Sequence, residues 1–278
     1  MTQGLVKNWM TSPVITGTPE MELSKARQIF DERHIRALPI LKDGQLIGLI
    51  NRQVLIRLDL SILGNEVWNL GIDVADETAA DVMKTNVLTI APDSTIHHTA
   101  RVMLENKVNA LPVLEDGKLI GIFTSSDLLR YIIAQYPSLG KKITVSDHMS
   151  DEVVTIQRST TLLEAHNLMG TKRIRSLPVV EEGKIVGLVT RTDLMSSDPT
   201  RPAMQNSQDT SYKVLAQPVE KVMVPEIITI SPDAELPEAA RIMLEKKIHC
   251  LPVVDEKCKM LGIITESDLF LMLLQKMV

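Results

Sequence analysis

Three segments of the chain carry two hydroxyl side chains and one aspartate at the same spacing. Each reads glycine, two apolar residues, a hydroxyl, a variable residue, a second hydroxyl, aspartate and leucine, and the copies span 121–128, 187–194 and 262–269. The hydroxyl residues are Thr124, Ser126, Thr190, Thr192, Thr265 and Ser267, and the acids are Asp127, Asp193 and Asp268. An ionised carboxylate can accept hydrogen bonds from both hydroxyls of a ribose, and hydroxyl groups can donate to phosphate oxygens. The segments therefore have the chemistry to bind a nucleotide.

The same residue types also cap helices, which is the structural alternative. Each segment stands where an apolar strand pattern gives way to an apolar helix pattern, and Asp, Ser and Thr are common N-cap residues worth about 1 kcal/mol. A helix beginning there would also offer unpaired N–H groups and a positive dipole end to an anion. Capping is the better interpretation of any single copy, whereas recurrence in three copies points beyond capping.

A fourth copy, at 48–55, has lost the polar pattern. Asn51, Gln53 and Val54 stand where the two hydroxyls and the acid are expected. Without a carboxylate a ribose loses its main acceptor. We therefore expect a weak or empty site in this copy and up to three sites in the chain.

The segments end four copies of a longer internal repeat. In each copy a methionine is followed by a threonine six residues later and by the proline of a Leu-Pro pair 29 residues later. The motif glycine follows that proline by nine residues, or by ten in the fourth copy. The methionines are Met10, Met83, Met149 and Met223; the threonines are Thr16, Thr89, Thr155 and Thr229; the prolines are Pro39, Pro112, Pro178 and Pro252.

Each repeat shows an α+β pattern in the order β-α-β-β-α. In the second repeat, 87–90 is rich in strand-forming residues, and apolar residues recur at helical spacing over 96–108. Two apolar runs then flank a turn at 115–118, where Gly117 can adopt positive φ. A second helix is expected over 128–134. One such unit buries little surface alone, so we expect the repeats to pair.

The repeats and their linkers suggest two modules. The repeats are expected at 1–60, 74–135, 141–197 and 215–278, and the modules at 1–140 and 141–278. A helix is expected over 54–63, with a break at Gly64-Asn65. The polar segment 196–217 carries Pro199 and Pro202 and is expected to be a connecting loop.

The composition favours a cytoplasmic protein without nucleic-acid or membrane partners. The net charge of the 278 residues is −5, and there is no basic block. Only two cysteines are present, so no disulfide framework is expected. No apolar run approaches the ~20 residues of a membrane span. With 44% apolar but only 3% aromatic residues, aliphatic side chains and methionine must fill the core.

The β-α-β-β-α repeat, the Leu-Pro-Val strand and the Gly-apolar-apolar-Thr-x-x-Asp ending resemble the CBS domain. The resemblance covers nearly the whole chain four times. It implies pairs of repeats, called Bateman modules, arranged about a pseudo-two-fold axis. It also implies that the cleft of a pair binds an adenosyl ligand, namely AMP, ADP, ATP or S-adenosylmethionine. The four-repeat arrangement is similar to stand-alone prokaryotic CBS proteins and to the γ subunit of AMP-activated protein kinase.

The resemblance also assigns roles to single residues. It implies that the motif carboxylates face the cleft of a pair, and that basic residues three positions before each Leu-Pro proline meet phosphates. That position holds Arg36, Asn109, Arg175 and His249, for which a solvated surface residue is the alternative. Thr89, Thr155 and Thr229 resemble threonines on the adenine and phosphate side, for which plain strand propensity is the alternative.

Together, the motifs and the resemblance predict a non-catalytic regulatory protein that senses adenine nucleotides and acts on a partner protein. The chain has no glycine-rich phosphate loop and no nucleophile elbow, and no histidine or cysteine set has metal-ligand spacing. No catalytic cofactor or metal is therefore expected. Two alternatives stay open, a module that binds S-adenosylmethionine and a ligand-free structural module. The sequence is also compatible with a homodimer.

Overall fold

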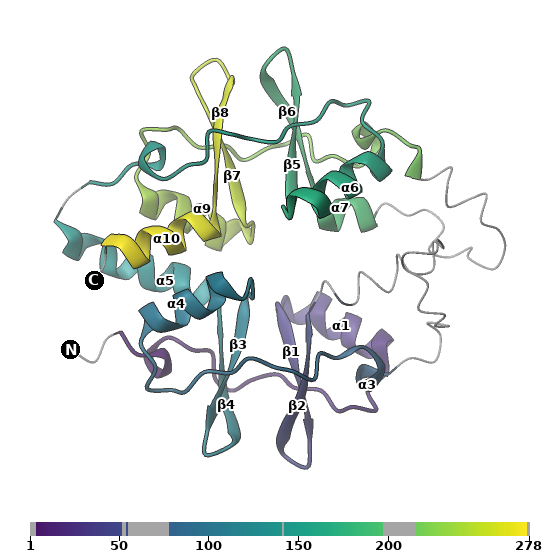
Figure 1. Cartoon of the computed structure of the whole chain (residues 1–278), viewed down its shortest axis with the longest axis vertical. Coiled ribbons are helices and arrows are strands. Elements are labelled where there is room, and N and C mark those ends of the chain that lie inside the picture. Colours follow the sequence, from purple (N-terminus) through teal and green to yellow (C-terminus); the bar gives the residue numbers. More distant parts are fainter. Residues whose placement is uncertain (1–3, 52–53, 55–77, 141, 197–214, 277–278) are drawn as a thin grey trace. The chain divides into compact units, whose positions relative to one another are not determined.

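The structure is a computed structural model of the chain and describes residues 4–51, 54, 78–140, 142–196 and 215–276 (Figure 1). The chain forms two compact units. Among the described residues, those up to 140 and 266–276 form the first unit, and those between 142 and 265 form the second. The expected module 141–278 differs from this division, because 266–278 groups with the first unit. The expected break at Gly64-Asn65 and most of 54–63 and 196–217 lie outside the described residues.

Every repeat contains a first helix and a β-hairpin, and a second helix follows in repeats two to four. In the first unit the elements are α1 (Leu23–Arg33), β1 (Ala37–Lys42), β2 (Gln45–Asn51), α4 (Ile96–Glu105), β3 (Ala110–Glu115), β4 (Lys118–Thr124) and α5 (Ser125–Gln135). In the second unit they are α6 (Leu162–Lys172), β5 (Ser176–Glu181), β6 (Lys184–Thr190), α7 (Arg191–Ser196), α9 (Leu236–Lys246), β7 (Cys250–Val254) and β8 (Met260–Thr265). The last helix, α10 (Glu266–Lys276), belongs to the first unit.

A short helical element precedes the methionine of each repeat. These elements are η1 (Val6–Asn8), α3 (Ala79–Val82), η4 (Val145–Asp147) and η5 (Val219–Lys221). A further turn, η3 (Tyr136–Leu139), follows α5. Among the described helices, none combines the length and the apolar character that a bilayer crossing needs.

The strand expected at the start of each repeat is reduced to one bridging residue. In the second repeat Ile90 pairs in parallel with Val113 on β3, whereas 87–89 is not part of a strand. Ile90 donates its N–H to the Pro112 carbonyl and accepts from the Leu114 N–H. Strand propensity over 87–90 was therefore a poor guide to length, because only Ile90 reaches the hairpin.

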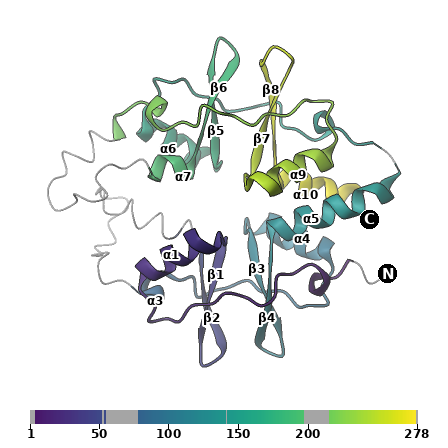
Figure 2. The ribbon, with the colours of Figure 1, turned by 180° about the vertical axis from the view of Figure 1, so that it is seen from behind.

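The hairpins form as the turn residues predict. The turn glycines of the first three repeats, Gly44, Gly117 and Gly183, have φ of 78°, 78° and 77°. The fourth repeat has a turn that is one residue longer and uses Cys258 at φ 60° instead. In the first unit the hairpins join into one sheet of order β1-β2-β4-β3, and both views show them side by side (Figures 1 and 2).

The methionine and glycine of the repeat explain how two repeats pair. Met10 packs on Gly121 and Met83 packs on Gly48, so each methionine reaches the other repeat of its pair. The second unit repeats this exchange with Met223 on Gly187 and Met149 on Gly262. A Cβ atom on any of these glycines would lie within 3.0 Å of the methionine sulfur. The recurring methionine side chain therefore occupies space that a Cβ atom would take, so the partner position requires glycine.

Backbone bridges also join the two repeats of each pair. The residue after each methionine forms an antiparallel bridge with the residue after the partner glycine. The bridges are Thr11 with Ile122, Lys84 with Leu49, Ser150 with Ile263, and Val224 with Leu188. Within a pair, the segment after the methionine of each repeat thus pairs with the hairpin of the other repeat.

The apolar end of the chain is part of the core of the first unit. Leu269, Phe270, Met272 and Leu273 on α10 are buried, and α10 packs against α4 and α5 (Figure 1). Repeat four thus contributes its last helix to the unit that holds repeats one and two.

Candidate functional site

Each intact motif lies at a junction between a strand and a helix, as the sequence predicts. β4 ends at Thr124 and α5 begins at the next residue. β6 likewise ends at Thr190, and β8 ends at Thr265. The aspartate therefore stands in the first helical turn, where backbone N–H groups have no partner within the helix.

Asp127 is fully enclosed by its own junction. One carboxylate oxygen accepts from the Thr124 N–H at 2.6 Å and from the Thr124 hydroxyl at 2.8 Å, and the other pairs with Arg130. The residue has 0% of its surface exposed. Burial raises the pKa of the Asp127 carboxyl, although the Thr124 hydrogen bonds and the Arg130 charge oppose the rise. In this conformation Asp127 is a buried helix cap.

Asp193 makes the same cap but borders solvent. Its carboxylate accepts from the Thr190 N–H at 2.8 Å and from the Thr190 hydroxyl at 2.6 Å. Its own N–H donates to that hydroxyl at 3.3 Å. Asp193 is only half-buried, whereas Asp127 is fully buried. In the third motif Thr265 and Asp268 are also half-buried.

The capping geometry is not confined to the motif. Thr78 gives the same two hydrogen bonds to Asp81, and Thr144 gives them to Asp147. In the damaged copy the Asn51 side chain accepts from the Val54 N–H at 3.0 Å. Gln53 lies outside the described residues. A cap alone therefore does not distinguish a ligand site, and it can form without a carboxylate.

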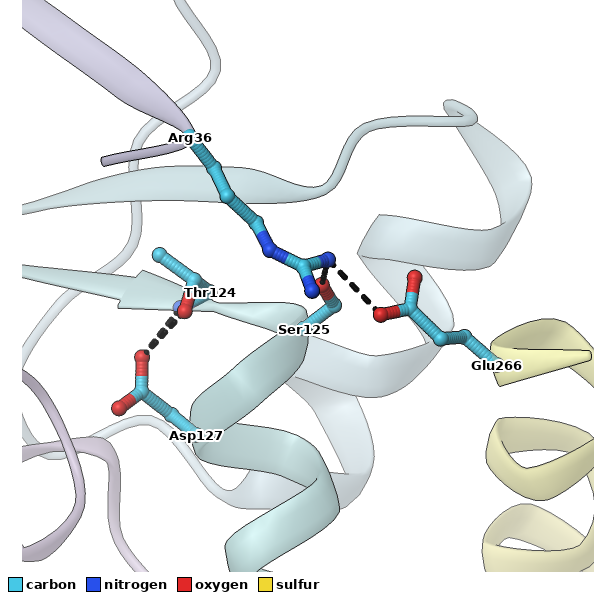
Figure 3. Close-up of polar contacts among 5 residues, drawn as sticks. All are labelled: Arg36, Thr124, Ser125, Asp127 and Glu266. Carbon is cyan, nitrogen blue, oxygen red and sulfur yellow. Dashed lines mark hydrogen bonds and ion pairs between the residues drawn. The ribbon is translucent and has the colours of Figure 1, made fainter. Parts of the chain in front are cut away.

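Arg36 is held inside the first unit and is not a solvated surface charge. Figure 3 shows its guanidinium pointing at the N-terminal ends of α5 and α10. Its Nη1 donates to the Ser125 hydroxyl and, at 2.8 Å, to the Glu266 carboxylate. The side chains of Arg36 and Glu266 are 23% and 3% exposed. The position next to the Leu-Pro strand thus directs its cation towards the motif of the paired repeat.

Glu266 could not have been identified from the repeat pattern. It occupies the variable position after the first motif hydroxyl, where the other intact copies have Ser125 and Arg191. Because the three residues differ in charge, the pattern carries no signal for this position.

In the second unit the backbone brings Arg175 to the motif. The Arg175 carbonyl accepts from the Arg191 N–H at 2.9 Å, and Asn109 accepts from Ser125 in the same way at 3.0 Å. Arg175 therefore lies directly beside the junction that holds Thr190 and Asp193. Both arginines add positive charge to this junction.

His166 on α6 is a further member of this region that sequence reasoning missed. Burial lowers the pKa of His166, and the Arg191 charge lowers it further. The imidazole is therefore neutral at pH 7. Nothing in the helical pattern of α6 separates His166 from ordinary packing residues.

The remaining candidates lie at the edges of these junctions. Thr89 and Thr155 are exposed and Thr229 is half-buried, each directly before a bridging isoleucine. Thr192 and Ser267 are exposed on the first helical turns, and Ser126 and His249 are half-buried. Their proposed contacts with a ligand stay predictions.

A depression of about 750 Å³ in the second unit does not coincide with these residues. It lies beside the β5-β6 hairpin and includes Arg158 and Glu181. Arg158 pairs with Glu181 at 2.9 Å and with Glu220 at 3.3 Å, so its charge is already neutralised. Within the described ranges, no group of three or more His, Cys, Asp or Glu residues could hold a metal ion.

A comparison with protein families matches the chain four times to the CBS domain. The matched residues are 6–61, 79–134, 145–199 and 219–274. The chain is 26% identical to the uncharacterized protein MJ1225 of Methanocaldococcus jannaschii, over 92% of this chain and 93% of that protein. It is 30% identical to MJ1404 of the same organism, over 95% of this chain but 60% of that protein.

Solved structures match over the same length. The crystal structure of MJ1225, described as a proposed archaeal homolog of g-AMPK, superposes with a TM-score of 0.79 at 25% identity. That match covers 96% of this chain and 98% of MJ1225. A conserved protein from Pyrococcus horikoshii has the same fold, with a TM-score of 0.66 at 24% identity over 97% and 99% of the two chains. The chain thus belongs to the CBS-domain family, of which it contains four domains in two pairs.

Proposed function

We propose that this chain is a non-catalytic regulatory protein that binds an adenine nucleotide between paired CBS domains. The observation that carries the proposal is the junction of the second unit. There a backbone hydrogen bond of 2.9 Å joins Arg175 to Arg191, which stands two residues before the half-buried Asp193. A nucleotide needs an acceptor for its ribose hydroxyls and cations for its phosphates, and this junction has both.

The capping role of Asp193 does not exclude a ligand. An ionised carboxylate can accept several hydrogen bonds at once, so a ribose can add to or replace the contacts that Asp193 makes within the chain. The cap also fixes the carboxylate before a ligand arrives, which lowers the entropy lost on binding. The damaged copy supports a second role for the acid, because Asn51 accepts from the Val54 N–H without any carboxylate.

The second unit is proposed as the principal site. Asp127 in the first unit is fully buried and paired with Arg130, so its carboxylate must be uncovered before a ribose can reach it. The MJ1225 structure supports a nucleotide-linked role, since MJ1225 is described as a proposed homolog of g-AMPK. The sites with Thr89, Thr155, Thr229, His249 and Asp268 remain part of the proposal.

Regulation would follow from differential affinity. A ligand that bridges two repeats favours whichever arrangement of the pair it binds more tightly, and it can shift the equilibrium only by that difference. A partner protein that senses the arrangement of the pair would provide the output. We propose the cytoplasm as the compartment, because a chain with only two cysteines has no disulfide framework.

Thermal unfolding with a panel of ligands tests the proposal. Nucleotide-stripped protein would be melted with AMP, ADP, ATP or S-adenosylmethionine at about 100 times the dissociation constant, where binding adds about 2.7 kcal/mol of stability. We expect at least one nucleotide to raise the melting temperature. A rise with S-adenosylmethionine alone would indicate a module for that ligand, and no rise with any of them would indicate a ligand-free structural module.

A further inference from the structure

The Arg36–Glu266 ion pair places an internal anion where a phosphate is expected. Arg36 stands at the repeat-one position that is proposed to meet a phosphate, and Glu266 is the first residue of α10 in repeat four. They are 230 residues apart in the chain, yet Nη1 and Oε1 lie 2.8 Å apart. Ser125, the first residue of α5, accepts from the same nitrogen (Figure 3).

A carboxylate and a phosphate make the same kind of contact with a guanidinium. Both are anionic acceptors, and arginine binds both through charge-assisted hydrogen bonds. Once Glu266 holds Nη1, a phosphate that needs this nitrogen has to displace it. We propose that Glu266 competes with the nucleotide phosphate for Arg36, so that phosphate binding in the first unit releases the first turn of α10. This inference rests on the proposed function.

Because the Glu266 side chain is buried, it has two stable positions, one paired with Arg36 and one in solvent. The Glu266 side chain is only 3% exposed, and a carboxylate that loses its arginine is very unfavourable in such surroundings. Glu266 must therefore turn towards solvent when a phosphate takes Arg36. The side chain starts at the N-terminal residue of α10, so this movement requires a change in the first helical turn.

Packing holds the rest of α10 in place. Leu269, Phe270, Met272 and Leu273 are buried, and the helix packs on α4 and α5. The change is therefore limited to the first turn, which also carries Ser267 and Asp268 of the third intact motif. A phosphate on Arg36 would alter the proposed ligand residues of repeat four. Because coupling is reciprocal, a ligand on Asp268 would alter the affinity of Arg36 for a phosphate.

Glu266→Gln tests the competition by calorimetry. Glutamine keeps the size of the side chain and an acceptor oxygen but loses the charge that rivals a phosphate. We expect the affinity of the first-unit site for AMP to rise roughly tenfold, since charge-assisted hydrogen bonds are about twice as strong as neutral ones. Adenosine, which has no phosphate, should bind equally to both proteins. Glu238→Gln removes an exposed carboxylate from the first turn of α9 and should leave the affinity for AMP unchanged.

Hydrogen exchange on the unaltered chain tests the release and needs no variant to fold. AMP should speed exchange of the amides at 267–270, and adenosine should not. Equal AMP affinity in the two proteins, or no change in exchange at α10 while AMP is bound, would overturn the inference and leave the proposed function standing. If neither protein binds AMP, ADP or ATP, the proposed function fails and the competition fails with it.

Discussion

Asp193 and Thr190 hold each other at the end of β6. Asp193 accepts from the backbone N–H and the hydroxyl of Thr190 at 2.8 and 2.6 Å, and it donates its own N–H back to that hydroxyl at 3.3 Å. The first residue of α7, Arg191, is tied to Arg175 by a backbone hydrogen bond. The Asp193 carboxylate thus ties the strand end to the helix start, next to the backbone contact between two arginines, and the account places the ribose there.

Asp193→Ala should remove about one bound nucleotide per chain. Alanine cannot accept from a ribose, and it also loses the helix cap, which costs about 1 kcal/mol of stability. Calorimetry gives the stoichiometry, and urea unfolding gives the stability.

Asp147→Ala is the matched control for the cap. Asp147 accepts the same two hydrogen bonds from Thr144, at 2.8 Å each, but lies outside the motif. Both variants should lose similar stability, and only Asp193→Ala should lose the ligand. Equal stoichiometry in the two variants would refute the ribose role of Asp193.

Arg175→Ala should separate nucleotides from S-adenosylmethionine. Hydrogen bonds to charged groups contribute about 1.5–3 kcal/mol, so the affinity for AMP should fall by about tenfold or more. S-adenosylmethionine has no phosphate and carries a sulfonium cation that an arginine repels, so its affinity should fall less than that of AMP. Arg241→Ala removes an exposed charge from α9 and serves as the control. An unchanged affinity for AMP in Arg175→Ala would show that this side chain does not bind phosphate.

Asp127→Asn should become more stabilising, relative to the natural chain, as the pH rises. Burial raises the pKa of Asp127 above its ordinary value of 3.8, so the folded chain holds this proton more tightly than the unfolded chain. The free energy of unfolding therefore falls as pH rises from below 3.8 to above the raised pKa, and asparagine removes that fall. Urea unfolding between pH 3 and 7 measures the difference between the two proteins. A difference that is constant over this range would contradict a raised pKa.

Gly187→Ala should destabilise the second unit by about 1–3 kcal/mol, the usual cost of overpacking. The new Cβ would lie within 3.0 Å of the Met223 sulfur. Adding Met223→Ala should recover part of the loss, because the two residues are in contact and their effects are not additive. Gly170→Ala is the control, since nothing lies within 4 Å of a Cβ at that helical position. Equal stability of the two glycine variants would contradict the packing of Met223 on Gly187.

The repeated parts of the fold could be predicted because each local signal recurs four times. The turn glycines, the Leu-Pro strands and the helix starts all lie where the spacing places them. The spacing of methionine and glycine was equally visible, but their contact was not, because Met10 packs on a glycine of the other repeat. The leading strands were overestimated, since propensity does not report how many residues reach a neighbouring strand.

The sequence predicted which residue types form the candidate site, but not how their side chains are arranged. Asp127 and Asp193 share one motif and one cap, yet tertiary packing buries the first and leaves the second accessible. Arg36 was expected at a phosphate, whereas its present partner is Glu266. That ion pair depends on α10 packing with the first unit, and no local pattern near either residue encodes that placement.

The most direct test of the account is calorimetric titration of AMP, ADP and ATP into nucleotide-stripped protein. The account predicts saturable binding of at least one of them, at one or more sites per chain, with one site lost in Asp193→Ala. No heat with any of the three, from protein that unfolds cooperatively, would contradict nucleotide binding and leave Asp193 as a helix cap alone.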